Sequence, residues 1–162
     1  MRRLRSAWFW LVGHAGVNRL SRALHPILYR WTGGWRFLGR SLGNLTVLVT
    51  TLGRHTGRPR TVALWAYPDG DALVLVGSYG GARRAPAWVH NLRARPEALV
   101  QVRRSVQRMT AREAAGEEYE RLWRMVTAAY PGYEAYLAWA QRTIPLVVLE
   151  PLSRDAVSVG PN

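Results

Sequence analysis

The chain has 162 residues, 48% of them hydrophobic, which suits a single compact domain with its own core. It has no cysteine, which excludes disulfides, thiolate nucleophiles and cysteine-based metal sites, and its four histidines lack metal-ligand spacing, so we expect no bound metal. All basic residues are arginines: residues 1–68 hold 11 and no acidic residue, whereas residues 69–162 hold 12 against 10 acidic residues. This positive field attracts polyanions such as nucleic acid, an anionic membrane surface, or a small molecule with phosphate and carboxylate groups.

The N-terminal segment combines arginines with tryptophans. Residues 4–29 have the pattern of an amphipathic helix, and the glycines and aromatic residues of 30–44 indicate a loop. The uncharged span of residues 6–18 is too short and too polar to cross a membrane. Two interpretations stay open: the helix lies along a membrane interface, or it packs on the domain with its arginines in water.

The rest of the chain predicts a barrel. Six strands are expected, at residues 45–52, 60–67, 72–77, 98–102, 106–112 and 144–149. Helices are expected at residues 86–95, 117–129 and 133–143. Several strands are apolar on both faces, which favours a small closed or split barrel over an open sandwich. The predicted fold class is α+β, mainly β: a split β-barrel of about six strands over residues 45–151, preceded by the 1–44 segment and followed by a loose tail at 152–162.

Two loops are suited to holding an anion. After the third strand, Gly80 and Gly81 allow positive φ, so a ligand can approach the backbone N–H groups ahead of the helix that Pro86 opens. In residues 53–60, glycines permit an open bend on which up to three guanidinium groups and a hydroxyl can converge on phosphate or carboxylate oxygens. A solvated hairpin turn is the alternative for the second loop, but the two loops and the charge together favour anion binding.

A third feature is a group of tyrosines. Tyr133 and Tyr136 share a helix face, and Tyr130 can join them across the Pro131-Gly132 helix entry. Such phenols either line a pocket for a flat ligand or are half-buried packing residues. No nucleophile elbow, zinc-protease motif or acid/base carboxylate pair is present in the sequence. The chain therefore looks like an enzyme in which a cofactor supplies the chemistry.

Several motifs, in this order, strongly resemble the deazaflavin-dependent nitroreductase family. They are residues 50–60, 78–81, 86–92, 130–133 and 142–151. The resemblance covers about residues 45–151. It implies a split β-barrel of the flavin-reductase type that binds the 8-hydroxy-5-deazaflavin coenzyme F420 and uses its reduced form to deliver hydride to quinones, nitroaromatics or activated double bonds. Family members often associate with membranes, which suits the arginine-tryptophan N terminus.

The resemblance implies three groups of site residues. The coenzyme's phosphate and oligoglutamate tail would be held by Arg54, His55, Thr56 and Arg60, with help from Arg58 or Arg83. The deazaflavin and its ribityl chain would be held by Ser78, Tyr79, Gly80, Gly81, Pro86 and Trp88. The substrate space would be bordered by Trp65, Ser78, Tyr130, Tyr133 and Tyr136. The implied catalytic residues are Ser78, Tyr130, Tyr133 and Tyr136, whose hydroxyls would stabilise or protonate the negative oxygen that develops on the substrate.

Two departures from the family pattern bear on these roles. His55 and Tyr79 stand where the best-known member has lysines, which weakens two contacts to the tail. Trp65 replaces a tyrosine and narrows the substrate space, so nitroreduction does not follow from the resemblance alone.

Two alternatives remain at this point. A basic module that binds nucleic acid or membrane would use the same arginines and tryptophans. An FMN-dependent oxidoreductase could use the same barrel, because FMN also carries a phosphate beyond its ribityl chain. The favoured interpretation is an F420-dependent oxidoreductase that acts on a small-molecule electron acceptor without a nucleic-acid partner. Its expected location is the cytoplasm, with peripheral contact to the inner face of the cell membrane and pairing into a homodimer as further expectations.

Overall fold

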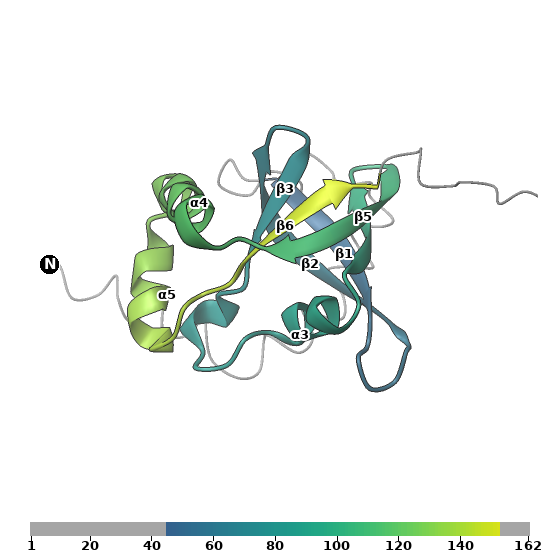
Figure 1. The fold of residues 1–162 in the computed structure, drawn as a ribbon, viewed down its shortest axis with the longest axis horizontal. Coiled ribbons are helices and arrows are strands. Elements are labelled where there is room, and N and C mark those ends of the chain that lie inside the picture. Colours follow the sequence, from purple (N-terminus) through teal and green to yellow (C-terminus); the bar gives the residue numbers. More distant parts are fainter. Residues whose placement is uncertain (1–44, 153–162) are drawn as a thin grey trace, which may run out of the picture.

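The computed structural model describes residues 45–152, and the predicted N-terminal helix, loop and C-terminal tail lie outside this range. Its elements are β1 (Leu45–Leu52), β2 (Pro59–Asp69), β3 (Ala72–Val76), the short 3-10 helix η2 (Tyr79–Gly81), α3 (Ala87–Ala94), β4 (Glu97–Val102), β5 (Ser105–Glu113), α4 (Gly116–Ala129), α5 (Gly132–Ala140) and β6 (Leu146–Pro151) (Figure 1). All six predicted strands and all three predicted helices are therefore present.

The six strands form one closed barrel in the order β1-β2-β3-β6-β5-β4. Every neighbouring pair is antiparallel, and the ring closes where Leu48 of β1 pairs with Gln101 of β4. The predicted α+β barrel is confirmed. Closure leaves no free sheet edge among these strands, so none of them offers a row of unpaired backbone groups.

Some element ends differ from the sequence-based prediction. Strand β2 continues to Asp69, so the connection to β3 is only two residues long, and Gly70 makes this turn at a φ of 61°. Helix α5 ends at Ala140 because Gln141 is left-handed, with a φ of 51°. Strand β6 starts at Leu146, directly after Pro145, which has no N–H to give to a sheet.

The apolar residues form two cores, which explains why β3 is hydrophobic on both faces. Leu73 and Leu75 point into the barrel interior, whereas Val74 and Val76 lie outside it with Leu122 of α4. Successive side chains of a strand point to opposite faces, so a strand between two cores must be apolar throughout. Helices α4 and α5 thus cover the outside of the barrel on one side, as Figure 1 shows.

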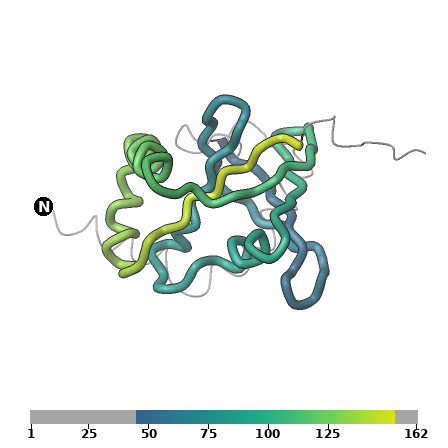
Figure 2. The backbone as a smooth tube through the Cα atoms, viewed as in Figure 1, coloured from purple at the N-terminus to yellow at the C-terminus, as the bar shows by residue number. Residues whose placement is uncertain are grey.

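Helix α3 closes one end of the barrel. It begins after Pro86, whose fixed φ and missing N–H suit a helix start. Its side chains Trp88, Val89 and Leu92 are buried in the interior core. The β1–β2 hairpin projects from the barrel beside this helix (Figure 2). Among residues 45–152, no helix is both long enough and apolar enough to cross a bilayer.

Candidate functional site

The bend between β1 and β2 is held by its own backbone. Gly53 N donates to Arg58 O at 2.9 Å, while Gly53 O accepts from Thr56 N at 3.1 Å and from Gly57 N at 2.7 Å. Gly57 has a φ of 64°, which a residue with a side chain rarely adopts. The arginine side chains of this bend therefore project from a rigid turn rather than from a loose loop.

Asn91 of α3 ties this bend to the barrel. Its side chain is 5% exposed; Oδ1 accepts a hydrogen bond from Arg54 N at 3.1 Å, and Nδ2 donates to Thr51 Oγ1 at 3.0 Å. A buried amide that satisfies two partners on another element fixes their separation. Asn91 thus sets where the first arginine of the bend lies relative to α3.

A cleft of about 560 Å³ opens between the bend and α3, and we call it the hairpin cleft. Its lining consists of Thr51, Gly53, Arg54, His55, Thr56, Pro59, Arg60, Thr61, Val62, Ala87, Trp88 and Asn91. Five of the predicted coenzyme-binding residues meet here, namely Arg54, His55, Thr56, Arg60 and Trp88. Arg58 is not part of the lining; its backbone N–H donates to Thr56 Oγ1 at 3.3 Å and so shapes the bend instead.

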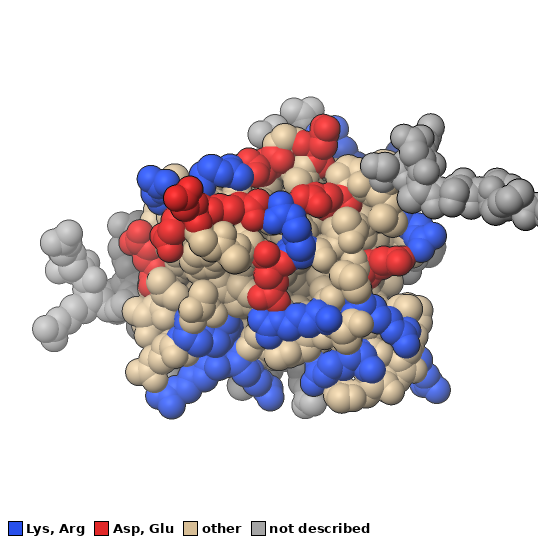
Figure 3. Space-filling model, in the orientation of Figure 1, with Lys and Arg blue, Asp and Glu red and all other residues tan. Residues whose placement is uncertain are grey.

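The arginines of the bend are not neutralised by carboxylates. Within residues 45–152, Arg54, Arg58 and Arg60 make no ion pair. Five of the carboxylates elsewhere are paired, as Arg93–Glu113, Arg108–Glu97, Arg112–Glu118, Arg112–Glu150 and Arg121–Asp69. Figure 3 shows arginines along the lower edge of the molecule and most acidic residues in its upper half. The cleft therefore lies in the positive part of the surface.

Electrostatics around His90 agree with this picture. Burial, together with the positive charges of Arg54 and Arg93, lowers the pKa of His90 from its ordinary value. The lowered pKa favours the neutral form of His90, so His90 adds little to the positive charge of Arg54 and Arg93.

The second predicted loop, residues 77–84, follows β3, and we call it the glycine loop. Tyr79, Gly80 and Gly81 have φ values of 52°, 64° and 78°, so three successive residues are left-handed. A Cβ at Gly80 would meet nothing within 4 Å, so this backbone is open to a ligand. Ser78 is 8% exposed, and its hydroxyl has no hydrogen-bond partner among residues 45–152. A buried hydroxyl without a partner is costly unless a ligand satisfies it.

The predicted aromatic residues come together on the outer side of the barrel. We call Tyr67, Tyr130, Tyr133 and Tyr136 the tyrosine cluster. Ring centroids lie 5.1 Å apart for Tyr130 and Tyr133, and 6.0 Å for Tyr133 and Tyr136. Trp65 of β2 contacts the ring of Tyr130 edge-on at 5.3 Å. All four predicted substrate-bordering aromatic residues therefore form one contiguous group.

The phenols of this cluster differ in exposure. Tyr133 is 5% exposed and its hydroxyl accepts a hydrogen bond from Tyr67 Oη at 3.1 Å. Tyr130 and Tyr136 are only half-buried, and their hydroxyls are 3.5 Å apart. Burial raises the pKa of Tyr133, and burial together with the hydrogen bond to Tyr130 raises the pKa of Tyr136 to about 12. Both phenols therefore stay protonated at neutral pH and can donate hydrogen bonds.

Strand β2 runs from the cleft to the cluster. Arg60, Thr61 and Val62 line the cleft, whereas Trp65 touches Tyr130. At about 3.3 Å per residue, five residues from Arg60 to Trp65 span about 16 Å. Because an odd number of residues separates them, Arg60 and Trp65 lie on opposite faces of β2, so the strand connects the cleft with the cluster without placing both on one surface.

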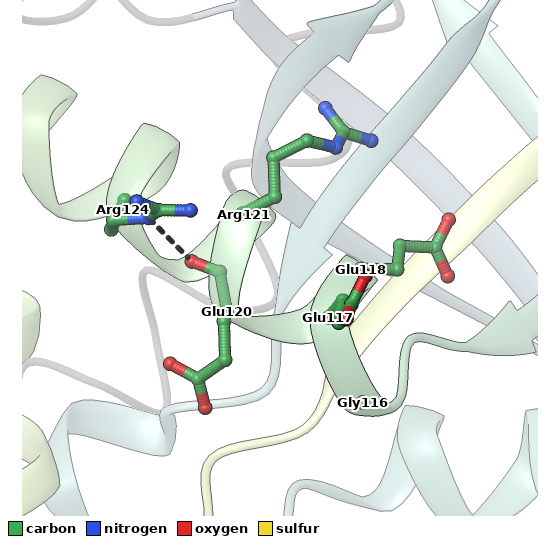
Figure 4. Close-up of a pocket in the computed structure, with 6 residues that line it drawn as sticks. All are labelled: Gly116, Glu117, Glu118, Glu120, Arg121 and Arg124. Carbon is green, nitrogen blue, oxygen red and sulfur yellow. Dashed lines mark hydrogen bonds between the residues drawn. The ribbon is translucent and has the colours of Figure 1, made fainter.

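A larger hollow of about 770 Å³ lies at the start of α4 and is not the candidate site. It is lined by Gly116, Glu117, Glu118, Glu120, Arg121 and Arg124, and Figure 4 shows that these side chains point in different directions rather than toward one centre. Glu118 and Arg121 are engaged with partners outside the hollow, and it contains no aromatic side chain and no predicted site residue.

Sequence reasoning missed several residues of the site. Thr51, Thr61 and Asn91 line the cleft, and Tyr67 completes the tyrosine cluster. Two of them had a signal in the sequence. Asn91 falls on the apolar face of α3, three residues after Trp88, and Tyr67 shares a strand face with Trp65 two residues earlier.

The chain matches known proteins over most of its length. Residues 22–151 match the family model of the F420H(2)-dependent quinone reductases. An F420H(2)-dependent quinone reductase of Mycobacterium tuberculosis is 37% identical over 145 residues, which cover 86% of this chain and 95% of that protein.

Two solved structures are also similar. One, an F420-H2 dependent reductase, has a TM-score of 0.60 at 37% identity over 65% of this chain and 93% of its own. The other, described as a domain-swapped dimer, has a TM-score of 0.63 at 32% identity over 83% of this chain and all of its own. The family match over residues 22–151 includes every strand and helix of the described barrel. The chain belongs to the F420H(2)-dependent quinone reductase family, and it is an oxidoreductase of the F420-dependent class.

Proposed function

We propose that this chain holds the anionic tail of reduced F420 in the hairpin cleft, holds its ring against the glycine loop, and reduces a quinone beside the tyrosine cluster. One observation carries the proposal. The hairpin cleft brings together Arg54, His55, Thr56 and Arg60, and neither arginine has a carboxylate partner within residues 45–152.

The residues of the hairpin cleft and the glycine loop fit this coenzyme. Arg54 and Arg60 have no carboxylate partner within residues 45–152, so their guanidinium groups are available for phosphate or carboxylate oxygens. At the other end, Ser78 offers a buried hydroxyl that lacks a partner among the described residues. The open backbone at Gly80 allows a flat ring to approach closely.

When bound, the reduced coenzyme supplies a hydride, and the side chains of this chain supply position and protons. Trp65 and Tyr130 meet edge-on, so a flat acceptor can stack on the face of one of these rings and contact the edge of the other. The half-buried Tyr136 donates a hydrogen bond to the acceptor oxygen on which negative charge develops, since its phenol is protonated at neutral pH. The buried Tyr133 packs against Tyr130 and Tyr136 and holds both rings in place.

A quinone is the favoured acceptor over a nitroaromatic or an activated alkene. The support comes from the family to which the chain belongs and from the relative of Mycobacterium tuberculosis named as a quinone reductase. Trp65 bears on the same choice, because its ring is larger than that of a tyrosine and lies edge-on to Tyr130, which leaves less space there, so nitroreduction is not assumed. The family likewise favours F420 over FMN as the cofactor.

The test offers the purified protein reduced F420 and, separately, a soluble quinone, a nitroaromatic and an activated alkene, with reoxidation of F420 followed by its fluorescence. The proposal expects the fastest reoxidation with the quinone. Reoxidation by the nitroaromatic or the alkene alone would overturn the choice of acceptor. Salt-dependent binding to any polyanion without reoxidation by an acceptor would favour the basic binding module.

A cytoplasmic location, peripheral membrane contact and a homodimer are further parts of the proposal. Residues 1–68 hold 11 arginines and no acidic residue, which suits contact with anionic lipid on the inner face of the membrane. Leu99 and Val106 on the β4–β5 hairpin are 46% and 59% exposed, which suits pairing through that face. Sedimentation with anionic vesicles tests the membrane contact, and light scattering after gel filtration tests the homodimer. Protein that stays in the supernatant contradicts the membrane contact, and a monomeric mass contradicts the homodimer.

A further inference from the structure

Arg142 follows α5 and reaches back to the glycine loop. Its Nη2 donates to Gly77 O at 3.1 Å, to Ser78 O at 3.3 Å and to Arg84 O at 3.1 Å, and its Nε donates to Ala82 O at 3.1 Å. One guanidinium group therefore holds four carbonyl oxygens spread over eight residues. We propose that Arg142 is a positioning residue that fixes the shape of the glycine loop and its place relative to the tyrosine cluster.

The remaining contacts of Arg142 exclude a simple ion-pair role. Its Nη1 donates to Thr143 O at 3.0 Å, and within residues 45–152 it contacts no carboxylate. Burial, with a smaller effect from the charge of Arg93, lowers the pKa of this guanidinium from its usual value, although it remains charged. A half-buried cation among carbonyl groups is stabilised by those dipoles, and it orders the chain that carries them.

The loop needs such a clamp because its conformation is unfavourable by itself. Tyr79 is left-handed without being glycine, and it precedes two left-handed glycines. Two short-range backbone bonds lie within the turn, from Gly81 N to Ser78 O at 3.1 Å and from Ala82 N to Tyr79 O at 3.3 Å, and Gly77 N donates to Pro145 O at 2.8 Å at its start. Without the guanidinium, several other backbone arrangements become accessible to a segment that contains Gly80 and Gly81.

A second contact joins the same two elements. A Cβ on Gly81 would lie 3.1 Å from Trp139 Cβ and 3.2 Å from Tyr136 O, so the loop backbone already packs closely on α5. Helix α5 carries Tyr133 and Tyr136, and Arg142 follows two residues after the helix ends. The clamp and this close contact therefore make the glycine loop and the tyrosines one rigid unit. The distance between a ring bound on the loop and the tyrosine hydroxyls is fixed before any ligand arrives.

This inference rests on the proposed function for its ligand. The effect of Arg142 on the glycine loop is therefore measured both without and with the coenzyme. Arg142→Met and Arg142→Lys are compared with Arg124→Met, which removes an equal charge from α4, where Arg124 Nε donates to Glu120 O. Amide hydrogen exchange of Gly81 and Ala82 is measured on the coenzyme-free protein. The F420 dissociation constant is measured by fluorescence at about 0.05 M and about 0.5 M salt.

The expected result has two parts. In both Arg142 variants, exchange at Gly81 and Ala82 rises about tenfold, whereas exchange in β3 and β6 stays unchanged. The F420 dissociation constant rises about tenfold in both variants, by the same factor at either salt concentration, because lysine keeps the charge but cannot reach four carbonyls at once. Arg124→Met changes neither quantity. If Arg142→Met does not fold, Arg142→Lys still reports both.

Three outcomes would overturn the inference. An unchanged F420 dissociation constant in Arg142→Lys means that coenzyme binding depends on the positive charge of residue 142 and not on the several N–H donors of the guanidinium group. Unchanged exchange at Gly81 and Ala82 means that the loop holds its shape without the clamp. Faster exchange with unchanged affinity means that the clamp is structural only. If the unaltered protein does not bind F420, the proposed function fails, while the exchange result still decides whether Arg142 orders the loop.

Discussion

The two ends of the site are built in opposite ways. The hairpin cleft is bordered by the exposed arginines Arg54 and Arg60, and neither has a carboxylate partner within residues 45–152. The tyrosine cluster is largely buried, and each of its rings packs on another ring of the cluster. The arginines of the cleft are therefore available to an anionic ligand, whereas the rings of the cluster already pack against one another.

This difference separates binding from turnover. Exposed cations attract an anion over distances set by ionic strength, so changes in the cleft should alter affinity in a salt-dependent way. A packed group of protonated phenols contributes little long-range attraction, but it holds donors where negative charge develops. The comparison predicts that substitutions at one end change the dissociation constant and that substitutions at the other end change kcat.

The largest effect is expected from Tyr136→Phe. Loss of this hydroxyl removes the donor proposed for the acceptor oxygen while the ring still packs on Tyr130 and Tyr133, so kcat should fall about 100-fold, as when one preorganised donor is lost. The F420 dissociation constant should change less than about twofold. Steady-state kinetics with a quinone and a fluorescence titration measure the two quantities.

Tyr119→Phe is the matched control for Tyr136→Phe. Tyr119 Oη donates to Ile144 O at 3.1 Å outside the cluster, so its loss should lower the free energy of unfolding by about 1 kcal/mol without changing kcat. An unchanged rate in Tyr136→Phe removes that phenol from the mechanism.

A smaller effect is expected from Arg60→Ala in the cleft. The F420 dissociation constant should rise about tenfold at low salt and less at high salt, because the contact is exposed and screened within about 10 Å. The rate at saturating coenzyme should stay the same. Arg104→Ala serves as the control, because Arg104 lies in the turn between β4 and β5. This turn is away from the bend, since Gln101 just before it pairs with Leu48 in the middle of β1. Equal losses in both variants would point to general charge rather than to the cleft.

Asn91→Ala should have a more modest effect at the same end. Without the amide, Arg54 N and Thr51 Oγ1 each lose a partner, so the protein should lose about 1–2 kcal/mol of stability and bind F420 about threefold more weakly. Thermal unfolding and the fluorescence titration measure this. Arg54→Ala keeps the backbone N–H and removes the side chain beyond Cβ, including the guanidinium; if it lowers stability as much as Asn91→Ala does, the hydrogen bond from Arg54 N to Asn91 has no separate role.

The smallest effect concerns pH. Burial raises the pKa of Tyr133, and it raises that of Tyr136 to about 12, so both phenols keep their protons well above neutrality. Because the raised pKa favours the neutral form, titration of these two phenols should change kcat less than about twofold between about pH 7 and pH 10. An alkaline loss of rate near pH 9 that disappears in Tyr136→Phe would contradict this.

Much of the fold could be predicted from local pattern. The β-branched runs of 45–52 and 72–77 and the Pro86 helix start all reflect preferences of the chain within a few residues, and the structure has each of these elements. The ends of β2 and α5 were less predictable. They depend on how far pairing with β3 continues and on the left-handed Gln141, which are tertiary effects.

The site was predictable where a residue type alone implied a role. The arginines of the bend and the tyrosines near Pro131 were found this way, and the structure groups each set in space. Asn91 and Arg142 were not found, because their roles lie in hydrogen bonds to backbone groups 37 and up to 65 residues away. No local pattern encodes a partner at that separation.

The central claim is that the cleft and the glycine loop together bind the coenzyme. It is tested most directly by titrating the purified protein with F420 and, in parallel, with FMN, at about 0.05 M and about 0.5 M salt, with fluorescence as the readout. The account predicts saturable binding of F420 that weakens with salt, and much weaker binding of FMN. No change in F420 fluorescence at any protein concentration, or equal binding of both compounds, would contradict it.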